Sequence, residues 1–598
     1  LTGLAVQAQE RVTKYNVRPA VVVRTPIQGD SINLTGDKFT LGNLLKTKIN
    51  IDFEGQPFQS LAADTAGYVS VKKADKDNLF YLFATNLRAE RFMKGKLNIY
   101  SPARFEVFVN GESKQSKDTA EDSLSQVRPT VVSLRLEPEA DYEIVIKLLS
   151  NADDKTQPVL KCEFEKDKDF ANVGCQLAPD LPRRLALANT FFGSRVSRVS
   201  LSPNGKYLLT RYSDNYSVDR SKVRCELTEV KTGRVILPNA DKEMSWMPVS
   251  NKLYYTVDGK QQKDLIVFDP ATMREEVLFT NVPEGNFVWS PTEDYLIYTP
   301  KDEGEKVSGP LKRILHPDDR IPGSRNRYYL VKYDATTGLS ERLTYGSHNV
   351  YLNDISPDGK KLLCSTSKSN ITKCPFSLSS LFEIDLATLK VDTLITWDAY
   401  LGGGSYSPDG KQLLLTGGPA AFGGIGQNCA PHPISNDFDT QAFIMDLSTK
   451  KITPITRDFN PTVSPLAWNR VDGCIYFNTT DEDCKNIYRY SPKNGSFEKL
   501  PLQEDVISSF TLSADNPSIA AYVGGGNTSS GVAYLYDAKK KTSTLLANPM
   551  KPTLDKIEFG KMDEWNFTAA DGTLIKGMIC LPPSFDPNKK YPLIVYYY

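Results

Sequence analysis

The side chains in this chain that could do metal or redox chemistry are nine cysteines and three histidines, His316, His348 and His432. Protein metal sites are usually built from close Cys and His pairs such as C-x-x-C. No C-x-x-C occurs, so we predict no metal site. We interpret His432 as an ordinary residue of a long insert rather than as a metal ligand or a catalytic base. No cofactor is predicted, because the glycine-rich stretch 417–426 does not match a phosphate-binding loop.

Two cysteine pairs have a spacing that fits disulfides across a hairpin. Cys364 and Cys374 are ten residues apart around one expected turn, and Cys474 and Cys484 are ten apart at a similar place in another repeat. A bridge forms only if the two partners lie opposite one another. The alternative is that all four are small apolar residues with free thiols.

Nucleophilic serine chemistry has a local signature that this sequence lacks. A nucleophile on a strand-to-helix turn is typically written G-x-S-x-G. The stretches 403–407 and 526–531 are rich in Gly and Ser, and both fail that spacing. The acidic pair Glu275-Glu276 follows a strand-like segment, where a solvated hairpin turn is the simplest explanation.

The elements that would position any site come from a repeat. S-P-N-G-K-Y-L-L begins at Ser202 and S-P-D-G-K recurs at Ser356 and Ser407; looser copies begin at 247, 290, 469 and 513. Pro followed by Asp-Gly or Asn-Gly is turn chemistry, and the apolar run after it is typical of a buried strand. A second hairpin follows each copy, so one repeat supplies about four strands, which is one propeller blade.

The spacing of the repeats predicts where the propeller begins and ends. Equivalent positions are 43 to 66 residues apart, and the shorter intervals match a blade of about 40–45 residues. We therefore predict a mainly β protein with a seven-bladed propeller over residues 195–549 and inserts where the spacing is long. An eighth blade would need the divergent stretch 158–195.

A separate antiparallel sandwich is predicted over residues 18–150. Phe105, Val107 and Val109 alternate along one expected strand, and the stretch 142–148 alternates in the same way. Asn110-Gly111 is a hairpin turn signal. The pattern fits a small jelly-roll-like domain that serves as a spacer or binds sugars, and residues 151–194 are expected to be a connector or a partial blade.

Composition narrows the partners and the location. Lys+Arg and Asp+Glu are both 72, so the formal net charge is zero, and neither nucleic acid nor an anionic membrane is expected as a partner. No window approaches the roughly 18 apolar residues of a membrane span. Residues 1–8 end in Val6-Gln7-Ala8 and resemble the tail of a secretory signal, which predicts cleavage after Ala8 and export to the periplasm or cell surface.

The most specific stretch follows the propeller. Residues 567–583 indicate a strand, a tight turn at Asp571-Gly572 and a second strand, and Lys590-Tyr-Pro-Leu-Ile-Val-Tyr596 opens a buried strand. A propeller followed by D-G-x-x-I-x-G-x-x-x-x-P and K-Y-P-L-I-V-Y resembles the prolyl oligopeptidase family of serine peptidases, including its dipeptidyl peptidase IV-like branch. The resemblance covers about residues 195–598.

This resemblance implies an exported peptidase that acts on short peptides. Its propeller would cap an α/β-hydrolase domain, of which residues 550–598 would be the first strands. The Ser, Asp and His of the triad would lie outside these 598 residues, so the chain is expected to be a truncated, inactive portion. Tyr598 would be a hydroxyl donor to the oxyanion, with Tyr596 and Tyr597 as fallbacks, unless all three are strand aromatics.

Glu275-Glu276 resembles the acidic pair with which dipeptidyl peptidases hold a substrate's N-terminus, but its hairpin context differs from theirs. The alternative function is a non-catalytic binding protein of the cell envelope, made of the propeller and the sandwich. A peptidase homologue that has lost its triad is a third alternative, which these residues do not distinguish from an active enzyme.

Overall fold

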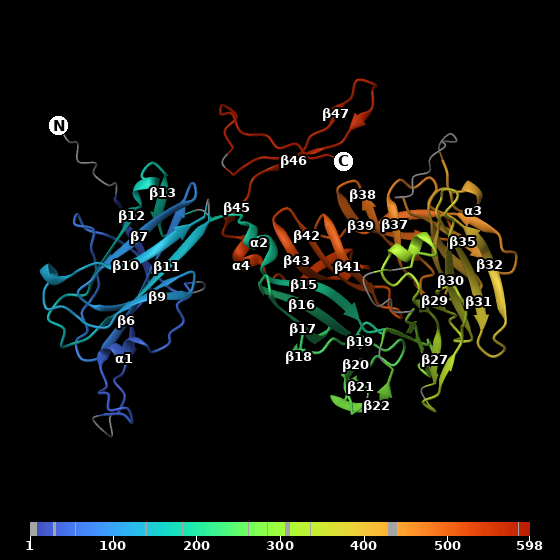
Figure 1. Cartoon of the computed structure of the whole chain (residues 1–598), viewed down its shortest axis with the longest axis horizontal. Helices are drawn as coiled ribbons and strands as arrows, with labels where there is room; N and C mark the ends of the chain where they lie inside the picture. Colours follow the sequence, from blue (N-terminus) through green and yellow to red (C-terminus); the bar gives the residue numbers. More distant parts are fainter. Residues whose placement is uncertain are drawn as a thin grey trace. The chain divides into compact units, whose positions relative to one another are not determined.

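The computed structural model describes residues 9–597, apart from 28–31, 54–55, 138–139, 182, 261, 284, 305–310, 312, 335, 429–438 and 584. The described residues are mainly β-structure, which confirms the predicted class (Figure 1). The chain divides into two compact units, one of residues 1–190 with 555–598 and one of residues 191–554. None of the described helices is long and apolar enough to cross a membrane.

The first unit contains the predicted sandwich. One sheet has the order β1 (Gln9–Arg11), β12 (Val159–Lys166), β7 (Met93–Tyr100), β10 (Thr130–Leu136), with β5 (Val69–Ser70) beside β12. The other has the order β4 (Gln59–Ala62), β2 (Lys14–Val17), β6 (Asn78–Ala89), β11 (Asp141–Ser150), β8 (Arg104–Val109), β9 (Glu112–Lys117), with β3 (Val21–Val23) and β13 (Cys175–Ala178) on β6. A capped helix, α1 (Leu41–Leu45), follows β3 in sequence.

The alternation predicted for residues 105–109 is confirmed, whereas the alternation predicted for 142–148 is wrong, because residues 144–150 are all buried. The domain is also longer than predicted. Phe105 and Val107 are fully buried in a core shared with Leu97 and Phe164. Because β12 and β13 pair with strands of the two sheets, the stretch 158–178 belongs to the sandwich rather than to a connector or partial blade. The sequence of this stretch lacks the propeller repeat, and its strands are assigned to the sandwich only by their pairing with strands far away in the sequence.

The second unit is a propeller of seven four-stranded blades within the described residues. Blade 1 consists of β15 (Gly193–Leu201), β16 (Tyr207–Ser217), β17 (Arg220–Glu229) and β18 (Val235–Ala240). Blade 2 consists of β19 (Ser245–Trp246), β20 (Leu253–Asp258), β21 (Lys263–Asp269) and β22 (Arg274–Val282). Blade 3 consists of β23 (Phe287–Trp289), β24 (Tyr295–Tyr298), β27 (Val331–Asp334) and β28 (Ser340–Arg342). Blades 4 and 5 consist of β29 (Val350–Ile355), β30 (Lys361–Ser369), β31 (Ser377–Asp385), β32 (Val391–Asp398); and β33 (Leu401–Tyr406), β34 (Gln412–Gly417), β35 (Gln441–Asp446), β36 (Ile452–Pro454). Blades 6 and 7 consist of β37 (Thr462–Trp468), β38 (Ile475–Asp481), β39 (Cys484–Ser491), β40 (Ser496–Lys499); and β41 (Val506–Leu512), β42 (Ile519–Gly526), β43 (Ser529–Asp537), β44 (Thr542–Ala547).

Each seam between neighbouring blades holds its own apolar cluster. The strands of a blade are buried on both faces, which is why the repeat shows apolar runs rather than alternation. Blades 6 and 7 share a cluster containing Tyr476, Tyr522 and Tyr536, whereas blades 7 and 1 pack smaller side chains such as Ala521 and Ala533. The propeller is therefore stabilised by seven side-by-side cores.

The repeated S-P-D-G turn works through its serine. Ser356 is buried; its hydroxyl donates to Asp358 at 2.7 Å and accepts from the amides of Lys360 and Lys361 at 3.1 and 2.8 Å. Gly359 has a φ of +71°, which a residue with a side chain rarely adopts. The turn therefore satisfies its own backbone groups between two buried strands.

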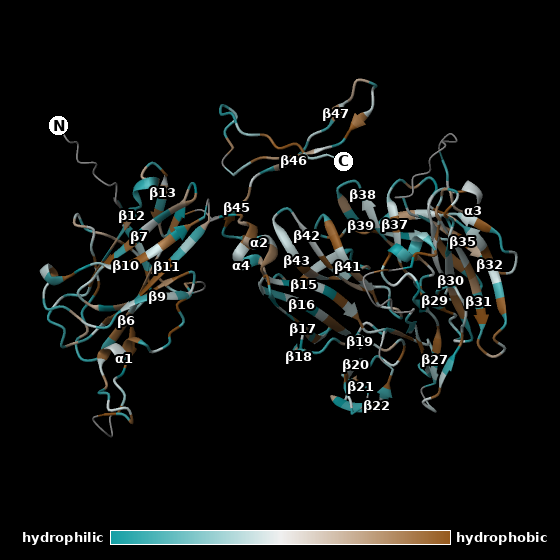
Figure 2. Cartoon of the chain, in the orientation of Figure 1, coloured by the Kyte–Doolittle hydropathy of each residue, from teal (hydrophilic) through white to brown (hydrophobic). Residues whose placement is uncertain are grey.

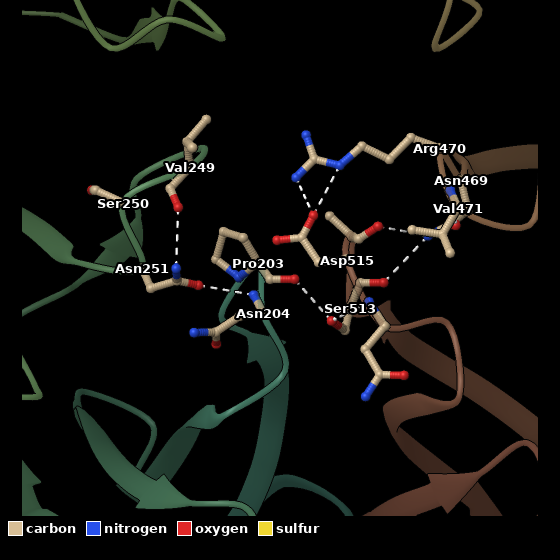
Figure 3. A network of polar contacts seen from close by, with 12 residues as sticks. Pro203, Asn204, Val249, Ser250, Asn251, Asn469, Arg470, Val471, Ser513 and Asp515 are labelled. Carbon is tan, nitrogen blue, oxygen red and sulfur yellow. Dashed lines mark hydrogen bonds and ion pairs between the residues drawn. The ribbon is translucent and has the colours of Figure 1, made fainter.

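The ring closes between blades 7 and 1 without a shared strand, because blade 7 is complete with β41 to β44 and blade 1 with β15 to β18. Figure 3 shows the polar contacts at this closure. The Ser513 hydroxyl donates to the Pro203 carbonyl at 2.8 Å, and the Asp515 amide donates to the same oxygen at 3.0 Å. Asn469 of blade 6 donates to the carbonyls of Ser513 and Ala514, so three blades meet at this point.

The segment after the propeller contributes to three two-stranded sheets. β45 (Ile557–Glu558) pairs with β14 (Arg183–Arg184), β46 (Met562–Glu564) with β49 (Met578–Cys580), and β47 (Phe567–Thr568) with β48 (Leu574–Ile575). Helices α2 (Leu187–Phe191) and α4 (Lys551–Leu554) lie close to the two ends of the propeller in sequence. The predicted turn at Asp571-Gly572 is confirmed, with Gly572 at a φ of +87°.

The buried strand predicted from Leu593 onward is wrong for the residues that are described. Residues 592–597 have no strand pairing, and Ile594 is 91% exposed. A strand requires a hydrogen-bonding partner, and no described residue supplies one here. In Figure 2, β47 also carries the colour of hydrophobic residues, and its residue Phe567 is 44% exposed.

Candidate functional site at the loop end of the propeller

The two ends of the propeller differ in what their connections carry. The S-P-D-G turns join the first and second strands of the blades, and we call that end the turn end. The opposite end, the loop end, carries the connections between second and third strands, including 299–330 in blade 3, 370–376 in blade 4 and 418–440 in blade 5. Gly193 pairs with Asn215 beside such a connection, so the chain enters the propeller at the loop end.

The chain also leaves the propeller at the loop end. Ala547, the last residue of β44, pairs with Ala533 near the start of β43, where the connection from β42 arrives. The two longest inserts and both chain passages therefore share one end of the ring. Functional residues concentrate on loops that a rigid scaffold positions, which makes this end the candidate functional site.

The blade 3 insert is ordered around one carboxylate. Asp319 lies in a short 3-10 helix (Pro317–Arg320) and is 4% exposed. Its oxygens accept from the amides of Leu315 and His316 at 2.9 and 3.1 Å and from two nitrogens of Arg325 at 3.0 and 2.8 Å. Hydrogen bonds from Arg325 hold the pKa of Asp319 well below its usual range. Four donors saturate this carboxylate, so its role is structural.

The same insert is attached to its neighbours. The Ser369 hydroxyl of blade 4 donates to Asp318 at 2.9 Å, and Arg342 pairs with Asp302 at 2.8 Å. Strands β25 (Lys301–Asp302) and β26 (Arg327–Tyr328) close the base of the insert. These contacts therefore hold the described part of the insert against blades 3 and 4 at the loop end.

Glu504 is a second fixed carboxylate at the loop end, between blades 6 and 7. Its backbone has a φ of +73°, an unfavourable conformation that the surrounding contacts maintain. The hydroxyls of Ser529 and Tyr534 both donate to it, the latter at 2.7 Å. A carboxylate can accept about four hydrogen bonds, so Glu504 keeps capacity for a positively charged ligand group.

Sequence reasoning singled out neither acid. For Asp319 a signal exists in His316-Pro-Asp-Asp-Arg320, because a proline at the first helical position with an acid two residues later is a helix-start pattern. Glu504 has no such local signal, since its two donors lie 25 and 30 residues further along the chain.

The two predicted disulfides are not formed, and their four cysteines are free thiols. The strand register explains this. Cys364 lies opposite Phe382, whereas Cys374 belongs to the connection beyond the end of the hairpin. Cys474 directly precedes β38, whereas Cys484 pairs with Asp481 at the far end of that strand. A ten-residue spacing covers a whole strand here rather than a turn.

Of the remaining predicted site residues, the structure describes Tyr596, Tyr597, Glu275 and Glu276. Tyr598 and His432 are outside the described residues, and Tyr596 and Tyr597 are 84% and 87% exposed. Glu275 and Glu276 lie on β22, the outer strand of blade 2, at its turn-end side, where they face Lys242 at 3.8 Å and Lys252 at 3.5 Å. This agrees with a solvated position rather than a ligand site.

Comparison with curated proteins gives two relatives with the same name. The chain is 23% identical over 448 residues to dipeptidyl-peptidase 5 of Porphyromonas endodontalis, covering 67% of this chain and 61% of that protein. It is 23% identical over 248 residues to dipeptidyl-peptidase 5 of Porphyromonas gingivalis, covering 40% of this chain and 33% of that protein. These two peptidase relatives confirm the predicted resemblance to peptidases of the prolyl oligopeptidase family. The chain spans less than two thirds of the length of these relatives.

Solved structures agree on the fold. An acylaminoacyl peptidase from Pyrococcus horikoshii is 13% identical and matches with a TM-score of 0.50, covering 68% of this chain and 60% of that chain. An acylaminoacyl peptidase in complex with Z-Gly-Gly-Phe-chloromethyl ketone is 14% identical, with a TM-score of 0.51 and the same coverage. No family model matches the chain.

Proposed function

We propose that this chain is the sandwich and propeller portion of an exported serine peptidase that hydrolyses short peptides. The observation that carries the proposal is the seven-bladed propeller with its inserts and both chain passages at one end, in a chain related to two dipeptidyl-peptidases. A ring with one elaborated end is suited to restricting which peptides reach a reaction centre. The signal-like residues 1–8 support export.

The proposed chemistry follows the family resemblance. A serine would attack the peptide carbonyl, a histidine would take and return the proton, and an aspartate would orient the histidine. The present sequence contains no G-x-S-x-G, so we propose that these residues belong to an α/β-hydrolase domain and that residues 1–598 alone are inactive. Tyr598 is proposed as the oxyanion donor of that domain.

Glu504 is our proposed contact for the substrate's amino group. It is fixed at the loop end by Ser529 and Tyr534, and it keeps capacity for a charged donor. A hydrogen bond between an ammonium and a carboxylate is stronger than one between neutral groups. Release of dipeptides from a free N-terminus would need such a contact, whereas cleavage inside a peptide would not.

The test compares residues 1–598 with the gene product that includes any sequence beyond Tyr598. Both are treated with a fluorophosphonate probe and with fluorogenic dipeptide substrates, with and without an N-terminal acetyl group. We expect the longer product alone to be labelled, to be active, and to prefer the free amine. Labelling of residues 1–598, or a longer product without a reactive serine, would contradict the proposal, and the second result would favour the envelope-binding alternative.

A further inference from the structure

A cavity of about 240 Å³ lies between blades 6 and 7 near the turn end, away from the loop end. It is lined by residues of β38 to β43 and by three turns, one before β38, one between β41 and β42, and one after β43. Pockets for drug-sized ligands measure about 300–1,000 Å³. This cavity therefore suits one residue-sized group rather than a long segment.

The strand pairing explains why a cavity forms at this seam. β39 and β41 are joined by a parallel bridge at Lys485 and Val506, near the loop end. Further along, β39 pairs with the four-residue β40 instead, so Tyr488 lies opposite Lys499. The blades are thus tied together at one end and separate toward the turn end, where the short outer strand does not fill the gap.

The inner wall of the cavity is apolar and aromatic. Tyr476, Ala520 and Tyr536 are almost fully buried, and Leu500 is 8% exposed. The ring of Tyr476 stacks on Phe510, with 6.4 Å between centroids and an interplanar angle of 20°. An apolar or aromatic side chain would gain by burial against these rings.

The mouth of the cavity carries a chain of alternating charges. Arg489 lies 3.3 Å from Asp472 and 3.5 Å from Glu498, and Lys541 pairs with Glu498 at 2.7 Å. The hydrogen bond from Lys541 lowers the pKa of Glu498. Both acids are therefore already neutralised within this network.

Lys539 is the third cation of the lining, and it has no ion-pair partner among the residues that the structure describes. The lining contains three cations and two carboxylates, which leaves one positive charge in excess. The neighbouring Lys540 is different, because it pairs with Asp537 at 3.5 Å and does not line the cavity. The excess charge at the mouth thus belongs to Lys539.

We propose that this cavity binds an apolar or aromatic residue through its free carboxylate, as found at a peptide C-terminus or in an N-blocked amino acid. The side chain lies against Tyr476, Tyr536 and Phe510, and the carboxylate faces Lys539. An ammonium group at the mouth would meet that excess positive charge, so a cationic ligand is disfavoured. The site lies within blades 6 and 7 and does not depend on the proposed peptidase activity.

Ligand-detected NMR on the full chain tests the site with N-acetyl-L-phenylalanine. We expect saturation transfer to its ring and millimolar affinity, of about 1–10 mM. The matching amide, N-acetyl-L-phenylalaninamide, should bind at least about fivefold more weakly because it lacks the charge. Gly-Gly-Phe and N-acetyl-L-phenylalanine separate the two sources, because tighter binding of the peptide identifies a peptide C-terminus and tighter binding of the acetylated acid identifies an N-blocked amino acid. Free phenylalanine carries its ammonium at the mouth and should bind more weakly than either.

Two single substitutions locate the binding. Lys539→Ala should weaken N-acetyl-phenylalanine about fivefold, and Lys540→Ala should leave its affinity unchanged. Both lysines are exposed on the same turn, so neither change is expected to disturb folding, and thermal unfolding of each variant checks this. The proposal is overturned if the acid does not bind, if the amide binds equally well, or if the two variants lose affinity to the same degree.

Discussion

The two ends of the propeller differ in how their connections are stabilised. The turn end repeats one short turn, in which a buried serine satisfies the local backbone, as Ser356 and Ser407 do. The loop end is irregular, with inserts that are held by unique contacts such as the one between Asp319 and Arg325. The repeated end stabilises the ring, and the irregular end is free to differ from blade to blade. This contrast places the repeated stabilising contacts at the turn end and the proposed peptidase-related site at the loop end.

Acid should affect the turn end most, because it acts on many turns at once. Serine hydroxyls two residues earlier lower the pKa of Asp358 and of Asp409, and Ser448 lowers the pKa of Asp446 to about 2. A carboxyl whose folded pKa is depressed stabilises the fold above its unfolded pKa, which is about 3.9, and this contribution is lost as the pH falls further. We expect the melting temperature to drop steeply below about pH 4.

The triple variant Asp358→Asn, Asp409→Asn and Asp446→Asn serves as the control for this acid effect. It should be less stable than the natural chain near neutral pH, and its melting temperature should fall less between pH 5 and 3, values that bracket the unfolded Asp pKa of about 3.9. Differential scanning fluorimetry across this range measures both quantities. Parallel profiles for the two proteins would show that these turns do not set the acid limit.

Asn469→Ala should have the largest effect among single substitutions. Asn469 is 4% exposed, donates to the carbonyls of Ser513 and Ala514 at 3.2 Å, and accepts from the Val471 amide at 2.9 Å. Its removal leaves buried groups unpaired where blades 6, 7 and 1 meet, at a cost of about 2–3 kcal/mol in the free energy of unfolding. Urea denaturation measures this, with the exposed turn residue in Asn494→Ala as control; equal losses would contradict the account.

Two serines of blade 4 give a matched test of the two ends. Ser356→Ala at the turn end removes three hydrogen bonds from a buried hydroxyl and should cost about 1–2 kcal/mol. Ser369→Ala at the loop end removes one exposed bond to Asp318 and should cost less than about 0.5 kcal/mol. Denaturation curves for both variants decide whether stability is concentrated at the turn end. The reverse ranking would refute that view.

Asp319→Asn should have the smallest effect on global stability but a clear local effect. The amide cannot form the two charge-assisted bonds with Arg325, so the insert 299–330 should open more often. Limited proteolysis should then cut this insert several times faster, while the melting temperature stays the same. Arg320→Gln, an exposed change in the same short helix, is the control and should not alter the cleavage rate.

The turn end was predictable from sequence because its information is local. Ser, Pro, Asp and Gly fix the turn within five residues, so the blades could be counted and their boundaries placed from the repeat alone. The same locality explains the failures. The stretch 158–178 joins the sandwich through strands far away in the sequence, and the spacing of Cys474 and Cys484 covers a strand rather than a turn.

The loop end could be located from sequence but not described. Long intervals between repeats showed where the inserts begin, but not what orders them. Glu504 accepts hydrogen bonds from Ser529 and Tyr534 only when blades 6 and 7 are packed together, and no short sequence pattern predicts these contacts. A candidate site built from contacts between blades is therefore visible only in the folded ring.

The most direct test of the account measures peptidase activity of the whole gene product, including any sequence beyond Tyr598, with one change at each end of the propeller. Asp319→Asn and Ser356→Ala are assayed on a dipeptide substrate and on a long unfolded peptide. The account predicts that Asp319→Asn alters the ratio of kcat/KM between the two substrates and that Ser356→Ala leaves it unchanged at a temperature where both are folded. An altered ratio in Ser356→Ala alone, or in neither variant, would contradict a functional loop end.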